Sequence, residues 1–373
     1  MKTPLKVDLI AGTRPNFVKI AALIHAISKE QSKSISIRLI HTGQHYSHSL
    51  SGQFFKQLEI PNPEINFNVG SGTQAHQTGL IMKKYEGLLK LSKPHLCIVV
   101  GDVTSSMAIA ITAKKMNVRL AHVEAGIRSN DHSMPEEINR LIIDSIADYF
   151  FTTTRSASQL LIQQGQNAEN IFFVGNTMID TLLKFKDKLN KPAIYDSLSL
   201  VKNKYLLLTL HRPSNVDDEQ TLIETLERIA DLTNGFPIIF PVHPRTKKIL
   251  KCFSLNIPNV NLIEPLPYLE FIYLLKNTKC ILTDSGGITE EATVLDIPCI
   301  TLRSNTERPE TVDLGTNELV GNDPILIAKA LKKLFDGKWK KGIAPELWDG
   351  HTGRRIINAL FEKVMNDFSV KDL

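Results

Sequence analysis

Short apolar runs alternate with amphipathic helical stretches along almost all of the 373 residues. Residues 95–102 (HLCIVVGD) and 118–126 (VRLAHVEAG) contain short runs rich in residues that favour strands, whereas residues 15–27 place apolar side chains at helical spacing. Strands that alternate with helices connect as parallel strands with crossover helices. The sequence therefore predicts an α/β fold with doubly wound parallel sheets, which bind ligands beyond the carboxyl ends of their strands.

This pattern occurs twice, which predicts two domains of similar build. A strand leads into GTRPN (residues 12–16) in the first half, and a strand leads into LHRPSN (residues 210–215) in the second. At about 150 residues per domain, the length also fits two domains. We expect an N-terminal and a C-terminal domain that face each other across a cleft holding the active site, and a terminal helix that packs back on the first domain. The expected boundaries are 1–185, 200–355 and 356–373, respectively.

The composition argues against several classes of protein. The net charge of +5 is mild, and no run of five like charges or basic-aromatic block is present, so we expect no nucleic-acid partner. No apolar stretch reaches the ~18 residues of a membrane helix, and the first apolar run is too short for a signal peptide. Cys97, Cys280 and Cys299 lie in apolar runs and no CxxC pair occurs, which favours a reducing compartment and a cytoplasmic location.

Sequence motifs for common cofactors are missing. The loops AGTRPN (residues 11–16) and TDSGGITEE (residues 283–291) lack GxGxxG, and GxxxxGK[ST] does not occur, so neither a nicotinamide enzyme nor a P-loop kinase is predicted. We interpret HTGQHYSH (residues 41–48) as a loop, because Gly43 breaks any helical face and no carboxylate or cysteine completes a metal-ligand set. We therefore expect no metal and no cofactor.

The segment TDSGGITEEAT predicts a strand, a tight turn and a helix. Ser285, Gly286 and Gly287 lie at the turn, where the small residues let backbone N–H groups approach a ligand. The start of a helix adds unpaired donors and a partial positive charge, which suits a diphosphate. Glu291 would lie within reach of a ribose. The alternative is an ordinary turn, with glutamates favoured early in the helix by its dipole.

Basic side chains follow the ends of several predicted strands. One alone would be an ordinary surface charge, but several at one edge of a sheet form a pocket suited to phosphate. These residues are Arg14, Lys19, Arg140, His211, Arg212, His243 and Arg245.

Three carboxylates, Asp102, Glu124 and Glu136, are predicted at the same edge of the first half. Each has a structural alternative: a helix cap for Asp102, an ion pair at a strand end for Glu124, and an exposed helix start for Glu136. If the three carboxylates lie together at this edge of the sheet, differences in their surroundings would give them different pKa values. One could then donate a proton and another accept a proton near neutral pH.

Ten motifs, in order along the chain, resemble the non-hydrolysing UDP-N-acetylglucosamine 2-epimerases. They are GTRPN, TGQH, VVGDVTSS, AHVEAGIRS, MPEEINR, VGNTMIDTL, the HR of TLHRPSN, PVHPRT, LTDSGGITEEA and TERPE. The resemblance extends to about residue 355. It implies two Rossmann-like domains in the glycosyltransferase-B arrangement and a homodimer that takes part in polysaccharide biosynthesis.

The resemblance also implies an activity and roles for residues. The implied enzyme interconverts UDP-GlcNAc and UDP-ManNAc without NAD or metal: it removes the C2 proton, eliminates UDP to leave 2-acetamidoglucal, and adds UDP back. The acid/base candidates are Asp102, Glu124, Glu136 and His211. The expected UDP contacts are Arg14, His243, Ser285, Gly286, Gly287 and Glu291, and Lys19 and Arg140 would hold phosphate or substrate.

Some positions depart from the commonest pattern of this family. Asn16, Pro213, Ser214 and the HYSHSLS that follows Gln44 are examples, and the last lies near a second, activating UDP-GlcNAc site known in some members. Members that use UDP-2,3-diacetamido uronic acids carry such variants, so a related sugar is an alternative substrate. A glycosyltransferase of the same fold is the alternative from another enzyme class, and a sensor that only binds nucleotide sugar is a third. The Arg-Pro of the first loop argues against the hydrolysing relatives.

Overall fold

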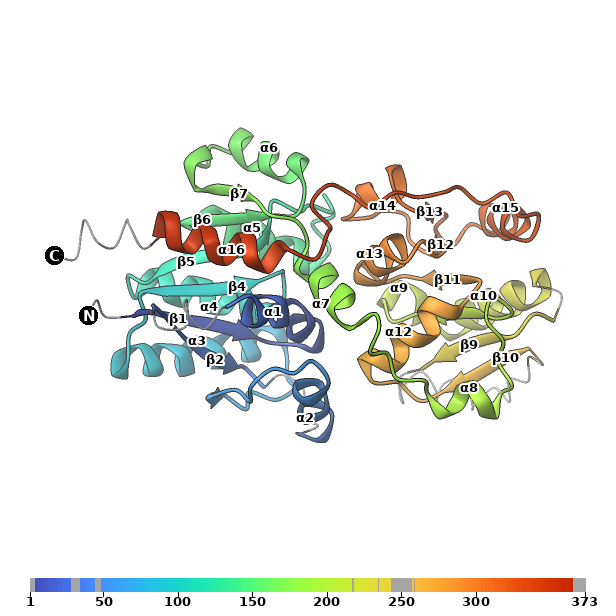
Figure 1. Ribbon diagram of the computed structural model, residues 1–373, viewed down its shortest axis with the longest axis horizontal. Helices are drawn as coiled ribbons and strands as arrows, with labels where there is room; N and C mark the ends of the chain where they lie inside the picture. Colours follow the sequence, from blue (N-terminus) through green and yellow to red (C-terminus); the bar gives the residue numbers. More distant parts are fainter. Residues whose placement is uncertain are drawn as a thin grey trace. The chain divides into compact units, whose positions relative to one another are not determined.

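Two parallel sheets form the framework of the chain (Figure 1). The computed structural model describes residues 4–27, 34–43, 48–216, 218–233, 235–242, 257 and 259–364. The chain divides into two compact units, of which the first comprises Met1–Lys184 and Glu346–Leu373 and the second Phe185–Pro345.

The first unit contains a seven-stranded sheet in the order β3-β2-β1-β4-β5-β6-β7. Its strands are β1 (Leu5–Ala11), β2 (Ile35–His41), β3 (Ile65–Asn66), β4 (Leu96–Val100), β5 (Arg119–Ala125), β6 (Tyr149–Thr152) and β7 (Ile171–Phe173). Neighbouring strands among the described residues are parallel, with Leu9 opposite Leu39 on one side and Ile98 on the other. The prediction of a doubly wound parallel sheet is confirmed for this unit.

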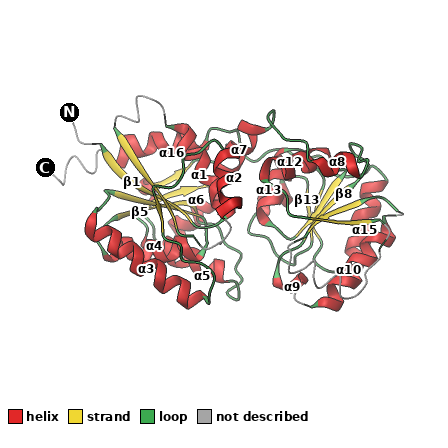
Figure 2. Cartoon of the chain, turned by 90° about the horizontal axis from the view of Figure 1, so that it is seen from below, coloured by secondary structure: helices red, strands yellow, loops and turns green. Residues whose placement is uncertain are grey.

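Helices cover both faces of the first sheet (Figure 2). They are α1 (Arg14–Ala26), α2 (His48–Gln57), α3 (Gln74–Leu91), α4 (Thr104–Lys115), α5 (Pro135–Ile146), α6 (Arg155–Gln163), the 3-10 turn η2 (Ala168–Asn170), α7 (Thr177–Phe185), α16 (Thr352–Ala359) and the π turn η3 (Leu360–Val364). Helices α3, α4 and α5 lie on one face, and α1 and α16 on the other. Ile81, Tyr85 and Ile109 of the first set pack with the strand residues Ile10 and Val99, which removes their apolar surface from water.

The second unit repeats this plan with a six-stranded sheet in the order β10-β9-β8-β11-β12-β13. Its strands are β8 (Leu206–Thr209), β9 (Ile238–Pro241), β10 (Val260–Ile263), β11 (Cys280–Thr283), β12 (Cys299–Thr301) and β13 (Asn317–Leu319). All the pairings described for this sheet are parallel. The expected second parallel sheet is therefore confirmed.

Helices also cover both faces of the second sheet. They are α8 (Ala193–Ser197), α9 (Pro213–Val216), α10 (Glu219–Leu232), α12 (Tyr268–Asn277), α13 (Gly286–Val294), α14 (Pro309–Asp313) and α15 (Pro324–Phe335). Helices α10 and α15 lie on one face, and α12 and α13 lie on the other (Figure 2). Leu226 and Leu331 from the first pair of helices pack with Leu208, Leu282 and Ile300 of the strands.

The C-terminal segment returns to the first unit at Glu346, whereas the sequence placed this return at residue 356. The Asp180 carboxylate accepts hydrogen bonds from Thr352 N (3.0 Å) and Gly353 N (2.7 Å) at the start of α16. A Cβ on Gly353 would lie 2.3 Å from the carbonyl oxygen of Ala22 in α1. The helix is therefore anchored by a carboxylate at its N-terminus and by a close approach that only glycine permits.

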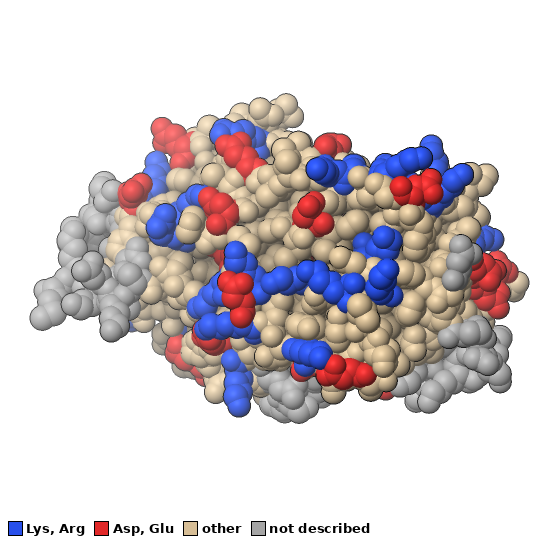
Figure 3. Space-filling model, turned by 45° about the vertical axis from the view of Figure 1, so that its right-hand side comes forward, with Lys and Arg blue, Asp and Glu red and all other residues tan. Residues whose placement is uncertain are grey.

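The surface carries charges of both signs. Lys and Arg side chains are interspersed with Asp and Glu side chains on the face drawn in Figure 3, in keeping with the mild net charge of +5. No helix in the described part of the chain combines the length and the apolar character that a membrane crossing requires.

Candidate functional site

Each sheet has a point at which the connections leave its strands toward opposite faces. In the first unit this point lies between β1 and β4, which are followed by α1 and α4, and in the second it lies between β8 and β11. Loops diverge at such points and leave a crevice at the carboxyl ends of the strands, where doubly wound proteins bind ligands. The predicted site residues follow these strands and their neighbours, so each unit is described in turn.

Glu124 and Lys19 form an ion pair at the carboxyl edge of the first sheet. Lys19 Nζ lies 2.6 Å from Glu124 Oε2, and both side chains are largely buried. Glu124 has a φ of +71° and lies where the pairing of β5 with β6 shifts register, between Val123 and Ala125. Such bulges redirect a side chain and are frequent near active sites. The bulge and the lysine together hold the Glu124 carboxylate at the edge of the sheet.

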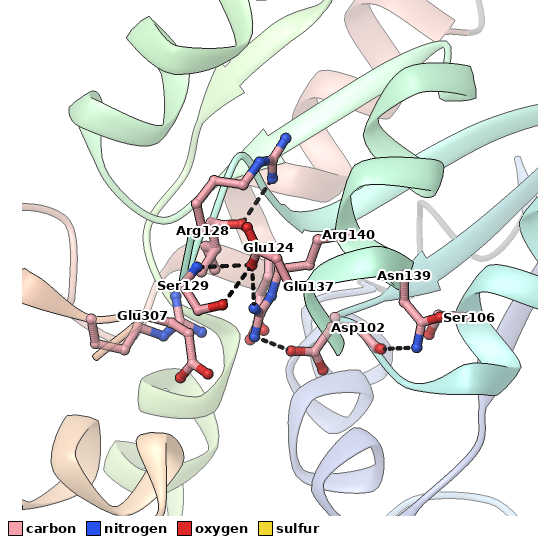
Figure 4. A network of polar contacts seen from close by, with 12 residues as sticks. Asp102, Ser106, Glu124, Arg128, Ser129, Glu137, Asn139, Arg140 and Glu307 are labelled. Atoms are coloured by element: carbon pink, nitrogen blue, oxygen red, sulfur yellow. Dashed lines mark hydrogen bonds and ion pairs between the residues drawn. The ribbon is translucent and has the colours of Figure 1, made fainter. Parts of the chain in front are cut away.

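Asp102 follows β4 and is held from two directions by α5 (Figure 4). Asn139 Nδ2 donates to the Asp102 carbonyl oxygen at 2.7 Å, and Arg140 Nη2 pairs with Asp102 Oδ2. The other guanidinium nitrogen, Nη1, lies 3.0 Å from Glu137 Oε2. Arg140 therefore bridges two carboxylates, and a planar guanidinium is well suited to such a bridge.

Glu137 is a residue that the sequence reasoning did not single out. Its carboxylate is buried and accepts hydrogen bonds from Ser129 N (2.8 Å), Ser129 Oγ (3.0 Å) and Asn130 N (3.3 Å). It thereby fixes the loop after β5 to the start of α5. The neighbouring Glu136, which the sequence reasoning did select, lines a pocket with Thr13, Gln74, Gln77, Val103, Thr104, Pro135 and Asn139.

A buried polar network lies behind these carboxylates. His122 of β5 is fully buried, with Nδ1 2.6 Å from Asp144 Oδ1 and Nε2 3.1 Å from the carbonyl oxygen of Gly101. Asp144 also accepts from Arg128 Nη1 at 2.6 Å and from Gly126 N at 3.1 Å. Burial alone would raise the pKa of Asp144, but its contacts with His122 and Arg128 lower it below the ordinary value. The network joins the backbones next to Asp102 and Glu124.

Asn16, which departs from the family pattern, links the loops at the β1–β4 crevice. Its Oδ1 accepts from Thr13 N at 3.0 Å and from Gly12 N at 3.3 Å, while its Nδ2 donates to the Val100 carbonyl oxygen at 3.0 Å. A glutamate here would accept the first two bonds but has no hydrogen to donate to Val100 when ionised. The amide therefore adds a bond between the two strand ends that a carboxylate does not provide.

His211 of the second unit follows β8 and contacts Asp284, which follows β11. His211 Nδ1 lies 2.7 Å from Asp284 Oδ1, and Asp284 is fully buried whereas 57 % of the His211 side chain is exposed. Asp284 also accepts from the backbone N–H groups of His211 and Arg212. Burial raises and the His211 contact lowers the pKa of Asp284, which ends below its ordinary value.

The predicted strand and helix at TDSGGITEEAT are confirmed, but Gly286 and Gly287 lie in the first turn of α13 and not in a turn before it. Ser285 is the N-cap of α13, which begins at Gly286, and Ser285 N donates to Thr283 Oγ1 at 3.0 Å. A Cβ on Gly286 would lie 3.2 Å from Glu307 Oε2, so this turn leaves little room for a side chain. The first turn of α13 presents the N–H donors of a helix N-terminus, a feature that favours negatively charged groups.

Glu291 lies in α13 and is buried, and its Oε1 accepts a hydrogen bond from Tyr268 Oη at 2.8 Å. Burial raises the pKa of Glu291 to about 8, the Tyr268 hydrogen bond opposes this effect, and the nearby Glu290 adds to it. The adjacent Glu290 instead pairs with Arg308, at 2.5 Å. Two neighbouring glutamates therefore have different partners and different surroundings.

The Glu291→Gln variant is expected to gain stability relative to the wild type as pH rises. The folded carboxyl has a pKa of about 8 against an ordinary 4.5, so the unfolded chain releases the proton first and the wild type loses stability across this window. The loss is at most about 1.4 kcal/mol for each pH unit. Urea unfolding of both proteins at a series of pH values measures it. A difference in the free energy of unfolding that stays constant with pH would contradict the buried, protonated state.

Several residues singled out in the sequence lie outside the described part of the structure. His243, Arg245 and His45 of the histidine-rich segment are among them, and the side chain of Arg14 at the start of α1 is also not described. In the described part of the chain, no group of three or more His, Cys, Asp or Glu side chains is arranged to hold a metal ion.

Comparison with known proteins identifies the family of this chain. A family model described as UDP-N-acetylglucosamine 2-epimerase matches residues 27–361. The chain belongs to this family. The resemblance seen in the ten sequence motifs is therefore confirmed, and so is the glycosyltransferase-B type of fold with two parallel-sheet α/β domains.

Relatives in the UDP-N-acetylglucosamine 2-epimerase family cover most of the chain. The UDP-N-acetylglucosamine 2-epimerase of Methanocaldococcus jannaschii is 42% identical over 368 residues, which are 95% of this chain and 99% of the relative. A UDP-2,3-diacetamido-2,3-dideoxy-D-glucuronate 2-epimerase from Pseudomonas aeruginosa is 38% identical over 320 residues, which are 85% of this chain and 88% of the relative.

A solved structure of this family has the same fold as this chain over almost the whole length of both proteins. The crystal structure of Methanocaldococcus jannaschii UDP-GlcNAc 2-epimerase in complex with UDP-GlcNAc and UDP matches with a TM-score of 0.85 at 42% identity. The match covers 95% of this chain and 99% of that chain.

Proposed function

We propose that this chain is a UDP-N-acetylglucosamine 2-epimerase that interconverts UDP-GlcNAc and UDP-ManNAc. The observation that carries the proposal is the set of acidic side chains at the carboxyl edge of the first sheet in a chain of this family. Asp102 and Glu124 are each held there by a cation, and Glu136 lines the adjacent pocket. Positioned carboxylates of this kind are what proton removal and proton return at a sugar carbon require.

The proposed reaction begins with removal of the proton at C2. Elimination of UDP in the anti sense then leaves 2-acetamidoglucal, and UDP adds back after a proton returns to the other face of C2. Asp102, Glu124, Glu136 and His211 are the acid/base candidates. Because the C2 proton is a poor acid, a positioned base contributes about 10²- to 10⁴-fold to the rate.

The departing UDP carries negative charge. We propose that residues of the second unit make most of the contacts that stabilise this charge. The N-terminus of α13, with Ser285, Gly286 and Gly287, would receive the diphosphate, and the buried Glu291 would lie toward the ribose. Arg14 and His243 are further proposed contacts. Lys19 and Arg140 pair with carboxylates in the structure, so we propose that they act on the substrate while holding Glu124 and Asp102 in place. Proton transfer and elimination of UDP involve no change of redox state.

We further propose a cytoplasmic homodimer that supplies a sugar nucleotide for polysaccharide biosynthesis. The family resemblance supports the dimer and the pathway. Cys97, Cys280 and Cys299 are buried free thiols, which is compatible with a reducing compartment.

Incubation of the purified protein with UDP-GlcNAc in D₂O tests the proposed reaction. We expect UDP-ManNAc to appear and deuterium to accumulate at C2, because the removed proton exchanges with solvent before one returns. Nuclear magnetic resonance of C2 and its hydrogen follows both. Free ManNAc would indicate a hydrolysing enzyme, and the absence of C2 exchange would contradict the epimerase.

A UDP-2,3-diacetamido sugar is a second candidate substrate. The observation that favours it is the 38% identity to the epimerase from Pseudomonas aeruginosa whose name specifies such a sugar. Parallel incubations with UDP-GlcNAc and with the UDP-linked 2,3-diacetamido uronic acid give kcat/KM for each substrate. The ratio of the two values shows which sugar the enzyme prefers.

A further inference from the structure

Asp284 is placed to control the protonation of His211. The residue was not among the site residues expected from the sequence, although it begins the DSGG turn. One of its oxygens, Oδ1, faces His211 Nδ1 at 2.7 Å. The other, Oδ2, accepts from His211 N at 3.0 Å, Arg212 N at 2.9 Å and Asn215 Nδ2 at 3.0 Å. Among the described residues, each hydrogen-bond partner of the carboxylate other than the imidazole is thus an N–H donor.

The surrounding amides fix the direction of these bonds. Asn215 Oδ1 accepts from Asn322 Nδ2 at 2.8 Å, and Asn215 Nδ2 also donates to the Leu302 carbonyl oxygen at 3.1 Å. The amide group of Asn215 must therefore present its NH₂ to Asp284. A carboxylate surrounded by donors is an acceptor only, so the hydrogen between Asp284 and the imidazole belongs to His211 Nδ1.

We propose that Asp284 is a positioning residue that keeps the proton of His211 on Nδ1 and makes Nε2 the nitrogen that exchanges a proton with the substrate. Nδ1 keeps its proton in both the neutral ring and the imidazolium, so a proton taken up by Nε2 in one half of the reaction leaves from Nε2 in the other. More than half of the His211 side chain is exposed, whereas Asp284 is fully buried. The acid/base role of His211 rests on the proposed function, but the tautomer does not.

The Asp284→Asn substitution is expected to invert the tautomer of His211. The introduced amide has the same shape, and its oxygen is required on the side of Arg212 N and Asn215 Nδ2, where donors converge. Its NH₂ then faces His211 Nδ1 and donates to it, which moves the ring proton to Nε2. Nε2 then has no lone pair to accept a proton.

Nuclear magnetic resonance of ¹⁵N-histidine-labelled protein tests the tautomer without any substrate. The His211 signals are assigned from their loss in a His211→Gln variant. In the wild type, above the pH at which the ring titrates, we expect a protonated Nδ1 and a bare Nε2, and in D284N the reverse. A wild-type ring with its proton on Nε2, or a D284N ring with unchanged tautomer, would overturn the proposal. The wild-type measurement decides the matter even if D284N does not fold.

Turnover of UDP-GlcNAc supplies the second readout. We expect kcat of D284N to fall about 10²-fold or more, with UDP affinity nearly unchanged, because the ring is still present but cannot act at Nε2. The control is Asp231→Asn, an exposed residue of α10, which should change neither quantity. A D284N enzyme with wild-type kcat would also overturn the proposal. If the wild type itself does not turn over this sugar, the proposed function fails while the tautomer still tests the role of Asp284.

Discussion

Turnover of UDP-GlcNAc is expected to fall by about 10²- to 10⁴-fold in the Asp102→Asn variant. The amide has nearly the shape of the carboxylate but does not accept a proton near neutral pH. Asn139 still donates to the backbone carbonyl of residue 102, so the loop after β4 keeps one of its two ties to α5. The loss should therefore appear in kcat far more than in the position of the loop.

The comparison of kcat with UDP affinity tests this expectation. Initial rates of UDP-ManNAc formation give kcat, and calorimetric titration with UDP gives the affinity, which we expect to change by less than about threefold, well under 1.4 kcal/mol. Glu169→Gln is the matched control, because it makes the same carboxylate-to-amide change at an exposed position of the first unit. Normal turnover in Asp102→Asn would remove Asp102 from the acid/base group.

The Arg140→Met variant is expected to lose about 3 to 5 kcal/mol of stability and most of its turnover. Arg140 is largely buried, with 7 % of its side chain exposed, and its guanidinium forms ion pairs with both Glu137 and Asp102. Methionine fills much of the same space but leaves the buried Glu137 carboxylate without that cation. Removal of one partner from a buried ion pair costs far more than the pair itself contributes.

Chemical unfolding and kinetics on the same preparations measure both effects. Arg155→Met is the matched control: its guanidinium pairs with Glu346, but 69 % of its side chain is exposed, and we expect little change in stability. An Arg140→Met protein as stable as this control would show that the bridge between the two carboxylates contributes little to the fold.

The sheets were predictable from the sequence because the signals for strands are local. Strand β4 lies within the run at residues 95–102, and α1 covers the stretch at residues 15–27 with a shift of a single residue at each end. The placement of Asp102 after β4 followed from the same pattern, because a polar residue that ends a buried strand must lie at the edge of the sheet. The local spacing of apolar residues therefore predicts these two elements and approximately where each of them ends.

The partners of the site residues were not predictable, because they come from distant parts of the chain. His122 and Asp144 are 22 positions apart, and Asp284 and His211 are 73 apart. The sequence pattern pointed to Glu136 and not to Glu137. Adjacent residues of a helix point in different directions, so a shift of one residue decides which of the two carboxylates is buried. The positive φ of Glu124 depends on a shift in strand pairing, which leaves no mark in a single sequence.

The packing of α16 on α1 affects the order in which the two units can fold during synthesis on the ribosome. Residues 352–359 pack on α1, yet they are translated after the whole of Phe185–Pro345. The second unit is contiguous and has all its residues as soon as it emerges from the exit tunnel. The first unit keeps one apolar flank of α1 uncovered until residues 352–359 have been translated, so a truncation before Glu346 removes a helix that completes the first unit.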